Sequence, residues 1–341
     1  MESNLRPMSL GEILDRTAQL YRENFLLLAG IASVYAGVLL VVGLAQTALQ
    51  ELLMLRHMTS LLVWTSAVSV LITWIIVFIF GGIAVAANNR AVAWLHLGEP
   101  ATIRAAYSSI LPRAGRYLWL MVLKAVFAWL PLILIYAAFI AMFVYVRFKG
   151  ILPQPGEPPH PIAPANGQAM LAFGIATIIL GLLLLPALAY GILMGLRYAL
   201  AVPACVVEDL TARAAIRRSI DLSKWSRGRI FILWLLVGVI EFGLAAFTQS
   251  FFIFETFRNR GGQLPIGLRI LQQIVGFCTT TFVHPILATG LTLFYYDQRV
   301  RKEGYDIEWM MQAAGLAPPA PAPQPAPVPP PPAPYELEGQ P

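Results

Sequence analysis

Charged side chains are scarce in this chain. Asp, Glu, Lys and Arg make up 12% of the 341 residues, whereas 58% of the residues are hydrophobic. A soluble protein carries about 25% charged residues, so the low value excludes an ordinary water-soluble domain and indicates lipid as the solvent. The net charge is +6, but the basic residues lie between apolar runs and not on one polar domain. We therefore expect anionic lipid head groups as partners and no nucleic acid.

Cysteine and histidine are also rare. Two cysteines, Cys205 and Cys278, and four scattered histidines form neither a disulfide framework nor a zinc-ligand pattern. Glycine loops that bind nucleotides, the His-Glu-x-x-His helix and the Gly-x-Ser-x-Gly turn are missing as well. The sequence therefore predicts no catalytic residue, no metal site and no cofactor.

Long apolar runs, by contrast, are frequent. A helix needs about 20 mostly apolar residues to cross the hydrocarbon core of a bilayer. Six runs reach that length, at residues 25–49, 61–87, 117–146, 169–196, 230–254 and 268–295. We predict an all-α integral membrane protein with a six-helix bundle over residues 1–312.

The basic residues outside these runs predict the orientation. Of the 24 Lys and Arg residues, seventeen lie in the N-terminal segment, the second and fourth connections and the C-terminal segment. Six lie in the other three connections. Because cytoplasmic segments are enriched in Lys and Arg, both ends of the domain are expected in the cytoplasm.

The segments that precede the first, third and fifth runs follow one plan. Each begins at a capping residue (Ser9, Thr102 or Thr211) and continues as a short amphipathic helix before a polar corner. We predict three parallel units, each an amphipathic helix followed by a membrane hairpin. The three helices either bind anionic lipid or only cap the bundle and anchor its topology. The candidate lipid-headgroup rim is Arg16, Arg22, Arg113, Arg116, Arg217, Arg218, Arg227 and Arg229.

Two ionisable residues fall inside the predicted spans. Lys124 is in the third span and Glu241 in the fifth, at depths that differ by about 6 Å. We expect the two side chains to pair inside the membrane. The pair belongs either to a polar substrate or proton path or to a structural ion pair, and the two residues can also reach the interface separately.

His284 and Pro285 lie in the sixth span, close to Thr279, Thr280 and Thr281. A proline inside a membrane helix frees a carbonyl group, which a threonine hydroxyl can satisfy. The segment therefore predicts a kink with local polarity, and a lone histidine there is a structural hydrogen-bonding residue more often than a catalytic one.

The C-terminal segment, residues 313–341, is rich in proline and alanine. Twelve of the 26 prolines lie between Pro318 and Pro341, which excludes a helix or a sheet strand and favours a disordered or polyproline II tail. Such a tail is either a solubilising spacer or a segment that docks to an aromatic groove of a partner protein.

Three stretches resemble one bacterial family. They run from Leu5 to Phe25, from Ala214 to Arg229 and from Tyr295 to Met310, and they are similar to segments of membrane proteins that resemble the membrane domain of glycerophosphoryl diester phosphodiesterase. The resemblance covers residues 5–312 and implies a multi-pass protein of the bacterial inner membrane. No stretch resembles the soluble catalytic barrel of the namesake enzymes, so phosphodiesterase activity is not expected.

Two functions are consistent with these features. The first is a non-enzymatic membrane protein that interacts with lipid or supports an envelope assembly, which the amphipathic helices and basic corners favour. The alternative is a transporter or channel for a small polar or amphiphilic substrate, which the repeats and the intramembrane charges favour.

Overall fold

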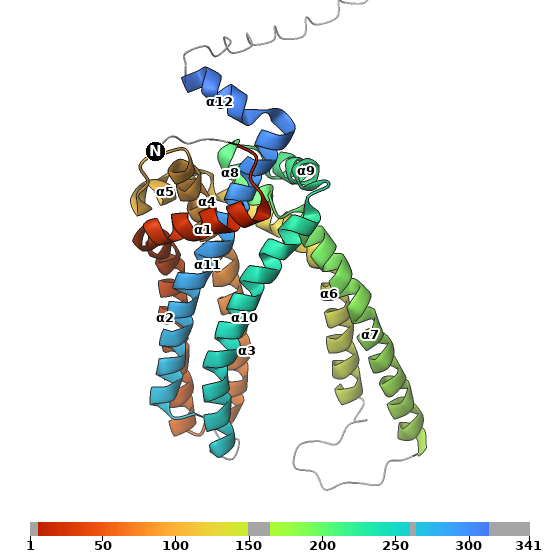
Figure 1. Cartoon of the computed structure of the whole chain (residues 1–341). Coiled ribbons are helices and arrows are strands. Elements are labelled where there is room, and N and C mark those ends of the chain that lie inside the picture. Colours follow the sequence, from red (N-terminus) through yellow and green to blue (C-terminus); the bar gives the residue numbers. More distant parts are fainter. Residues whose placement is uncertain (1–5, 149–163, 260–263, 314–341) are drawn as a thin grey trace, which may run out of the picture.

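The computed structural model describes residues 6–148, 164–259 and 264–313, and over these residues every regular element is a helix (Figure 1). Nearly all of the Pro-rich segment 313–341 lies outside the described residues. Six helical segments are long and apolar enough to cross a membrane. Their helices are α2 (Phe25–Leu55), α3 with α4 (Thr59–Ile76 and Gly82–His96), α6 (Ala114–Phe148), α7 (Pro164–Arg197), α10 (Arg227–Arg258) and α11 (Ile266–Glu303).

All six predicted runs lie within these helices, but the helices extend beyond them. The second span differs most, because a π-helical turn, η1 (Val77–Gly81), separates α3 from α4. The sequence analysis did not predict this turn. Hydropathy depends on side-chain type, and a π-turn changes only the backbone hydrogen-bond pattern.

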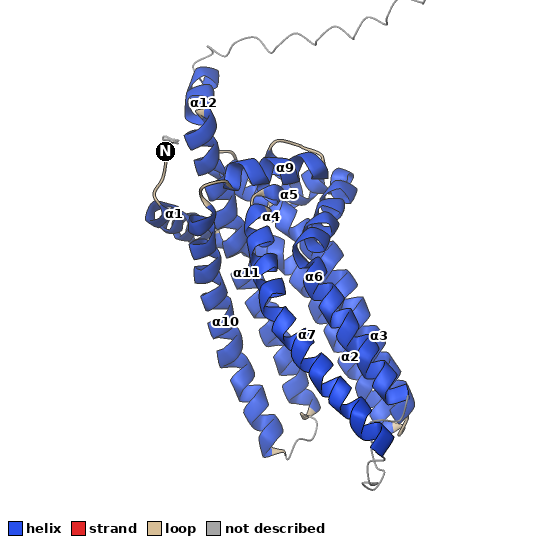
Figure 2. Cartoon of the chain, turned by 90° about the vertical axis from the view of Figure 1, so that its right-hand side faces the viewer, coloured by secondary structure: helices blue, strands red, loops and turns tan. Residues whose placement is uncertain are grey.

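The spans form two groups. Helices α2, α3, α10 and α11 lie together, and α6 packs along α7 as a separate hairpin. This hairpin contacts α4 at one end of the molecule and diverges from α10 toward the other end (Figure 1). Viewed from the side, the N-terminus and α12 (Tyr305–Ala313) lie at the same end of the spans (Figure 2).

Three short amphipathic helices cover that end: α1 (Leu10–Glu23), α5 (Ile103–Ile110) and α9 (Ala212–Ser223). We call them the collar. The predicted capping box of α1 is confirmed, since the Ser9 hydroxyl accepts from the Glu12 N–H and Glu12 accepts from the Ser9 N–H at 2.6 Å. The hydrogen bonds from Ser9 lower the pKa of Glu12. Thr102 caps α5 in a similar way, whereas the Thr211 side chain makes no capping bond.

The apolar faces of the collar helices are buried in the protein. Ile13 of α1 and Ile110 of α5 are fully buried, and Ile216 of α9 is 8% exposed. The collar end also holds the largest buried side chains, including Tyr117 and Phe294. The helices therefore pack onto the bundle, with their hydrophobic surface directed at protein and not at lipid.

Hydroxyl groups fasten each collar helix to a neighbouring span or connection. Tyr21 of α1 donates to the carbonyl of Phe282 in α11, and Tyr107 of α5 donates to the carbonyl of Ile31 in α2 at 2.7 Å. Ser219 of α9 donates to the carbonyl of Arg197 at the end of α7 and accepts from the N–H that precedes α8 (Ala201–Val207). These bonds fix the position of the collar on backbone groups.

Replacing Tyr107 with phenylalanine tests one of these fastenings. The change removes the hydroxyl and leaves the ring, so we expect a loss of about 1 kcal/mol of stability, the usual value of one such hydrogen bond. The apparent melting temperature of the purified protein in detergent measures the effect. Tyr136→Phe is the matched control, because Tyr136 is 69% exposed on α6 and has no described hydrogen bond; an equal drop in both variants would contradict the prediction.

Candidate functional site

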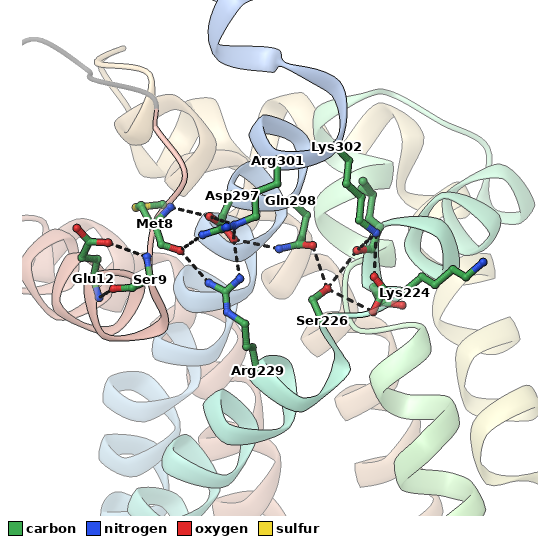
Figure 3. Close-up of polar contacts among 12 residues, drawn as sticks. Met8, Ser9, Glu12, Lys224, Ser226, Arg229, Asp297, Gln298, Arg301 and Lys302 are labelled. Atoms are coloured by element: carbon green, nitrogen blue, oxygen red, sulfur yellow. Dashed lines mark hydrogen bonds and ion pairs between the residues drawn. The ribbon is translucent and has the colours of Figure 1, made fainter.

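A buried carboxylate joins three segments that are far apart in the sequence (Figure 3). The side chain of Asp297 in α11 is fully buried and accepts hydrogen bonds from the Met8 N–H at 2.8 Å and from Arg301 at 3.0 Å. Arg229, in the first turn of α10, donates to the same carboxylate at 3.3 Å. The Met8 carbonyl accepts from both arginines, at 2.8 and 2.6 Å. The N-terminal segment is thus held between α10 and α11.

Four of the eight arginines of the predicted lipid-headgroup rim bind carboxylates of the protein. Arg113 and Arg116 both pair with Asp209, and Arg229 pairs with Asp297. The charges of these three residues are compensated within the chain, and their contact with lipid head groups stays a prediction.

Arg218 is held by two carboxylates as well. It pairs with Glu208 at 2.9 Å and donates to Glu303 of α11 at 2.6 Å. Burial by itself lowers the pKa of Arg218, but the hydrogen bonds to Glu303 and Glu208 outweigh it and raise the pKa above the usual range. This residue therefore stays charged and ties α9 to α11.

The remaining rim residues differ from one another. Arg16 donates to Gln19 on its own helix at 2.8 Å. Arg22 and Arg217 are exposed and make no ion pair with a described residue. Arg227 has a buried Nε without a partner among the described residues. Among the eight rim arginines, these four have no ion pair in the described part of the chain.

The predicted pair of Lys124 and Glu241 is not formed. Neither side chain has an ion-pair partner among the described residues, and Glu241 is exposed on α10. Lys124 shares a cavity with Trp234 of α10, and Glu241 lies seven residues beyond Trp234, about 10 Å further along the helix. The divergence of α10 from the α6–α7 hairpin leaves Glu241 without that partner (Figure 1).

Lys124 instead lines a cavity of about 350 Å³ inside the bundle. The wall is mainly apolar and aromatic, and it includes Tyr35, Trp129, Tyr198 and Trp234. Lys124 lies ten residues into the 35-residue helix α6, a rise of about 15 Å, and the cavity wall also includes Gly195 and Tyr198 at the end of α7. The cavity therefore lies in the half of the spans nearer the collar.

Three polar groups in this cavity lack partners. The ammonium group of the half-buried Lys124 has no hydrogen-bond or ion-pair partner among the described residues, and two buried ring nitrogens, His284 Nε2 and Trp234 Nε1, have none there either. All three groups line one cavity. An unpaired buried donor loses about 1–3 kcal/mol relative to a paired one, so the arrangement favours a ligand that accepts hydrogen bonds and carries negative charge.

Backbone features shape the cavity wall. The π-turn η1 contributes Val77, Phe78 and Gly81, and such turns are common at functional sites. Gly195 of α7 makes room for an aromatic wall residue, because a Cβ at this position would lie 2.8 Å from the Trp234 ring.

The kink expected at His284 and Pro285 stays a prediction. Pro285 lies inside α11, and His284 lines the cavity. The expected threonine contact differs, since the Thr281 hydroxyl is buried and has no partner in the described part of the chain. The carbonyl of Phe282, three residues before the proline, accepts from Tyr21 of the collar. A side chain from a distant segment thus meets a carbonyl beside the proline.

The chain has the helices of a multi-pass membrane protein, by length and by composition. Within the described ranges, no three His, Cys, Asp or Glu side chains come together as a metal site requires. No family model, curated protein or solved structure matches the chain. The cavity and the charges around it therefore carry the functional argument.

Proposed function

We propose that this chain is a non-enzymatic, lipid-interacting membrane protein that holds an anionic amphiphile in the cavity beside Lys124. The observation that supports the proposal is an unpaired ammonium group in a mainly apolar cavity, next to the unpartnered nitrogens of His284 and Trp234. A charged group inside the membrane requires a counter-charge. No carboxylate of a described residue lines this cavity, so the ligand supplies the counter-charge.

The shape of the wall favours a ligand with an apolar part. The aromatic rings of Tyr35, Phe78 and Trp129 and the aliphatic side chains suit a hydrocarbon tail, and the polar groups suit a carboxylate or phosphate head. A cavity of this volume lies within the range of about 300–1,000 Å³ typical of small-molecule sites.

A brominated fatty acid tests this proposal, because bromine quenches nearby tryptophan fluorescence and Trp129 and Trp234 line the cavity. We expect saturable quenching by the acid. In Lys124→Met the affinity should fall about tenfold or more, the equivalent of about 1.4 kcal/mol. The methyl ester of the same acid is the matched control, since it keeps the tail and lacks the charge. Equal affinity of Lys124→Met and the unmodified protein for the acid would refute the proposal.

The architecture belongs to the same proposal. We propose three units of one amphipathic helix and one hairpin, beginning at α1, α5 and α9, with both ends in the cytoplasm of a bacterium and the spans in its inner membrane. The hydroxyl fastening shared by the three collar helices supports this division. The resemblance to the membrane domain of glycerophosphoryl diester phosphodiesterase supports the location, and the Pro-rich segment 313–341 is proposed as a site for a protein partner.

Transport of a polar or amphiphilic substrate is the second candidate function. A further cavity of about 240 Å³ lies between α2, α3 and α11, with Gln46, Thr73, Gln273 and Thr280 in its wall. Thr280 lies one turn from His284 on α11, so the two cavities are neighbours along this helix. Uptake of a labelled amphiphile into proteoliposomes that depends on Gln273 would favour transport over simple binding.

A further inference from the structure

A second cavity with unpaired cations lies at the collar end, apart from the cavity beside Lys124. It has a volume of about 630 Å³ and lies between the end of α7, the end of α9 and the start of α10. Its polar lining consists of Arg197, Asp221, Lys224 and Arg227, and Trp225 stands at its edge. We call it the collar pocket.

The three cations of the collar pocket have no carboxylate partner among the described residues. This distinguishes them from Arg113, Arg116, Arg218 and Arg229, all of which are ion-paired. The Nε groups of Arg197 and Arg227 are buried and unpartnered as well. The Arg197 guanidinium donates to the sulfur of Met194 at 3.9 Å, which is a weak acceptor. Two half-buried arginines whose Nε–H groups are buried without an acceptor favour an anionic ligand.

The first turn of α10 faces the same pocket. The Ser226 side chain does not cap this helix, because its hydroxyl bonds to Gln298 at 2.9 Å and to carbonyl groups of α9. Backbone N–H groups at an uncapped N-terminus are free to bind an anion. Gly228, in this turn, lines the pocket and has open space where a Cβ would point. A phosphate group can therefore approach the backbone here.

Hydrogen bonds from α11 hold the turn between α9 and α10 in place. Lys302 of α11 donates to the carbonyls of Asp221, Leu222 and Lys224 at 2.7, 3.0 and 2.9 Å (Figure 3). Trp225 follows with φ +70°, a left-handed conformation that is rare for a bulky residue, and it is 93% exposed. Tryptophan is enriched at the membrane–water interface, and the first apolar residues of α10 follow within a turn. The pocket and the Trp225 ring thus lie at one boundary of the spans.

We infer that the collar pocket binds the phosphodiester head group of an anionic phospholipid, with Arg197 and Arg227 on its phosphate oxygens and Trp225 in the adjoining interface. The Asp221 carboxylate reduces the charge of the lining from +3 to +2, which suits a singly charged phosphodiester. Arg227, Trp234 and Glu241 are spaced seven residues apart and share one face of α10. A lipid bound at Arg227 can extend its chains along this face.

Native mass spectrometry of the full chain with phosphatidylglycerol and phosphatidylcholine tests the inference. We expect the anionic lipid to bind about tenfold more tightly than the neutral one, and the double variant Arg197→Gln/Arg227→Gln to lose this preference. The matched control is Arg213→Gln/Arg217→Gln, which removes two exposed arginines of α9 outside the pocket. The control should keep the preference, and so should Lys124→Met, which alters only the cavity of the proposed function.

Asp221→Asn provides a test that does not depend on the stability of the arginine variants. Removing this exposed carboxylate raises the positive charge of the pocket, so phosphatidylglycerol should bind more tightly. Equal binding of the two lipids, equal loss in both arginine double variants, or an unchanged affinity in Asp221→Asn would overturn the inference. Inorganic phosphate at millimolar concentration distinguishes the source: if it displaces the lipid completely through Arg197 and Arg227, the ligand is a soluble phosphate and the lipid assignment is wrong.

Discussion

Replacing Asp297 with asparagine is expected to destabilise the protein more than any other single change considered. The Asp297 side chain is fully buried and accepts hydrogen bonds from the Met8 N–H, Arg229 and Arg301. Asparagine has almost the same shape but no charge, so both guanidinium groups would lose their counter-ion. Breaking a buried ion pair on one side costs about 3–5 kcal/mol. Because Arg229 and Arg301 keep 28% and 38% of their side-chain surface exposed, we expect the lower end of this range.

The loss should also release the N-terminal segment, since the Met8 peptide is held by Asp297 and the two arginines together (Figure 3). Thermal unfolding in detergent measures the stability, and limited proteolysis before α1 measures the release. Asp15→Asn is the matched control, because Asp15 is exposed on α1. A melting temperature of Asp297→Asn equal to that of Asp15→Asn would show that the contact carries no stability.

Three stretches of the sequence, residues 5–25, 214–229 and 295–310, meet around Asp297. Met8 comes from the first stretch, Arg229 from the second and Arg301 from the third (Figure 3). The contact between these stretches was not predicted, and Arg229 was expected in the lipid-headgroup rim. A polar residue beside an apolar run can face lipid head groups or another segment equally well. The signal in the sequence for this contact was Asp297, an acidic residue among basic neighbours at the end of the sixth span.

The spans were predictable because a single physical requirement determines them. A helix that crosses a bilayer must be apolar over about 20 residues, and six such runs lie within the observed helices. The capping box at Ser9 was also predictable, since its two partners are three residues apart. Local spacing was sufficient for both features.

The predicted pair of Lys124 and Glu241 was wrong because it depends on the distance between two helices, which local spacing does not give. Helical rise estimates depth along each helix, but it does not indicate how far apart two helices stand. Helix α10 diverges from the α6–α7 hairpin (Figure 1), so Glu241 is exposed whereas Lys124 lines a cavity with His284. Lys124 and His284 were both predicted as polar residues inside the spans. Their position in the wall of one cavity was not predicted.

Gly195→Ala is expected to have the second large effect, because Gly195 is the position where α7 accommodates the Trp234 ring. A Cβ at residue 195 would lie 2.8 Å from the Cη2 atom of Trp234 and 3.0 Å from its Cζ3 atom. The indole is rigid, so either the ring moves within the cavity or α7 and α10 separate. Overpacking of this kind costs about 1–3 kcal/mol. We expect a lower melting temperature together with weaker binding of the brominated fatty acid.

Gly181→Ala is the control on the same helix, because no atom lies within 4 Å of a Cβ at that position. Alanine is favoured over glycine inside a helix by about 0.5–1 kcal/mol, so this variant should be as stable as the unmodified protein or slightly more stable, with unchanged fatty-acid binding. The two substitutions are chemically identical and differ only in what the added methyl group meets. If Gly195→Ala binds the acid as tightly as Gly181→Ala does, the position of Trp234 does not matter for the ligand and the cavity beside Lys124 is not its site.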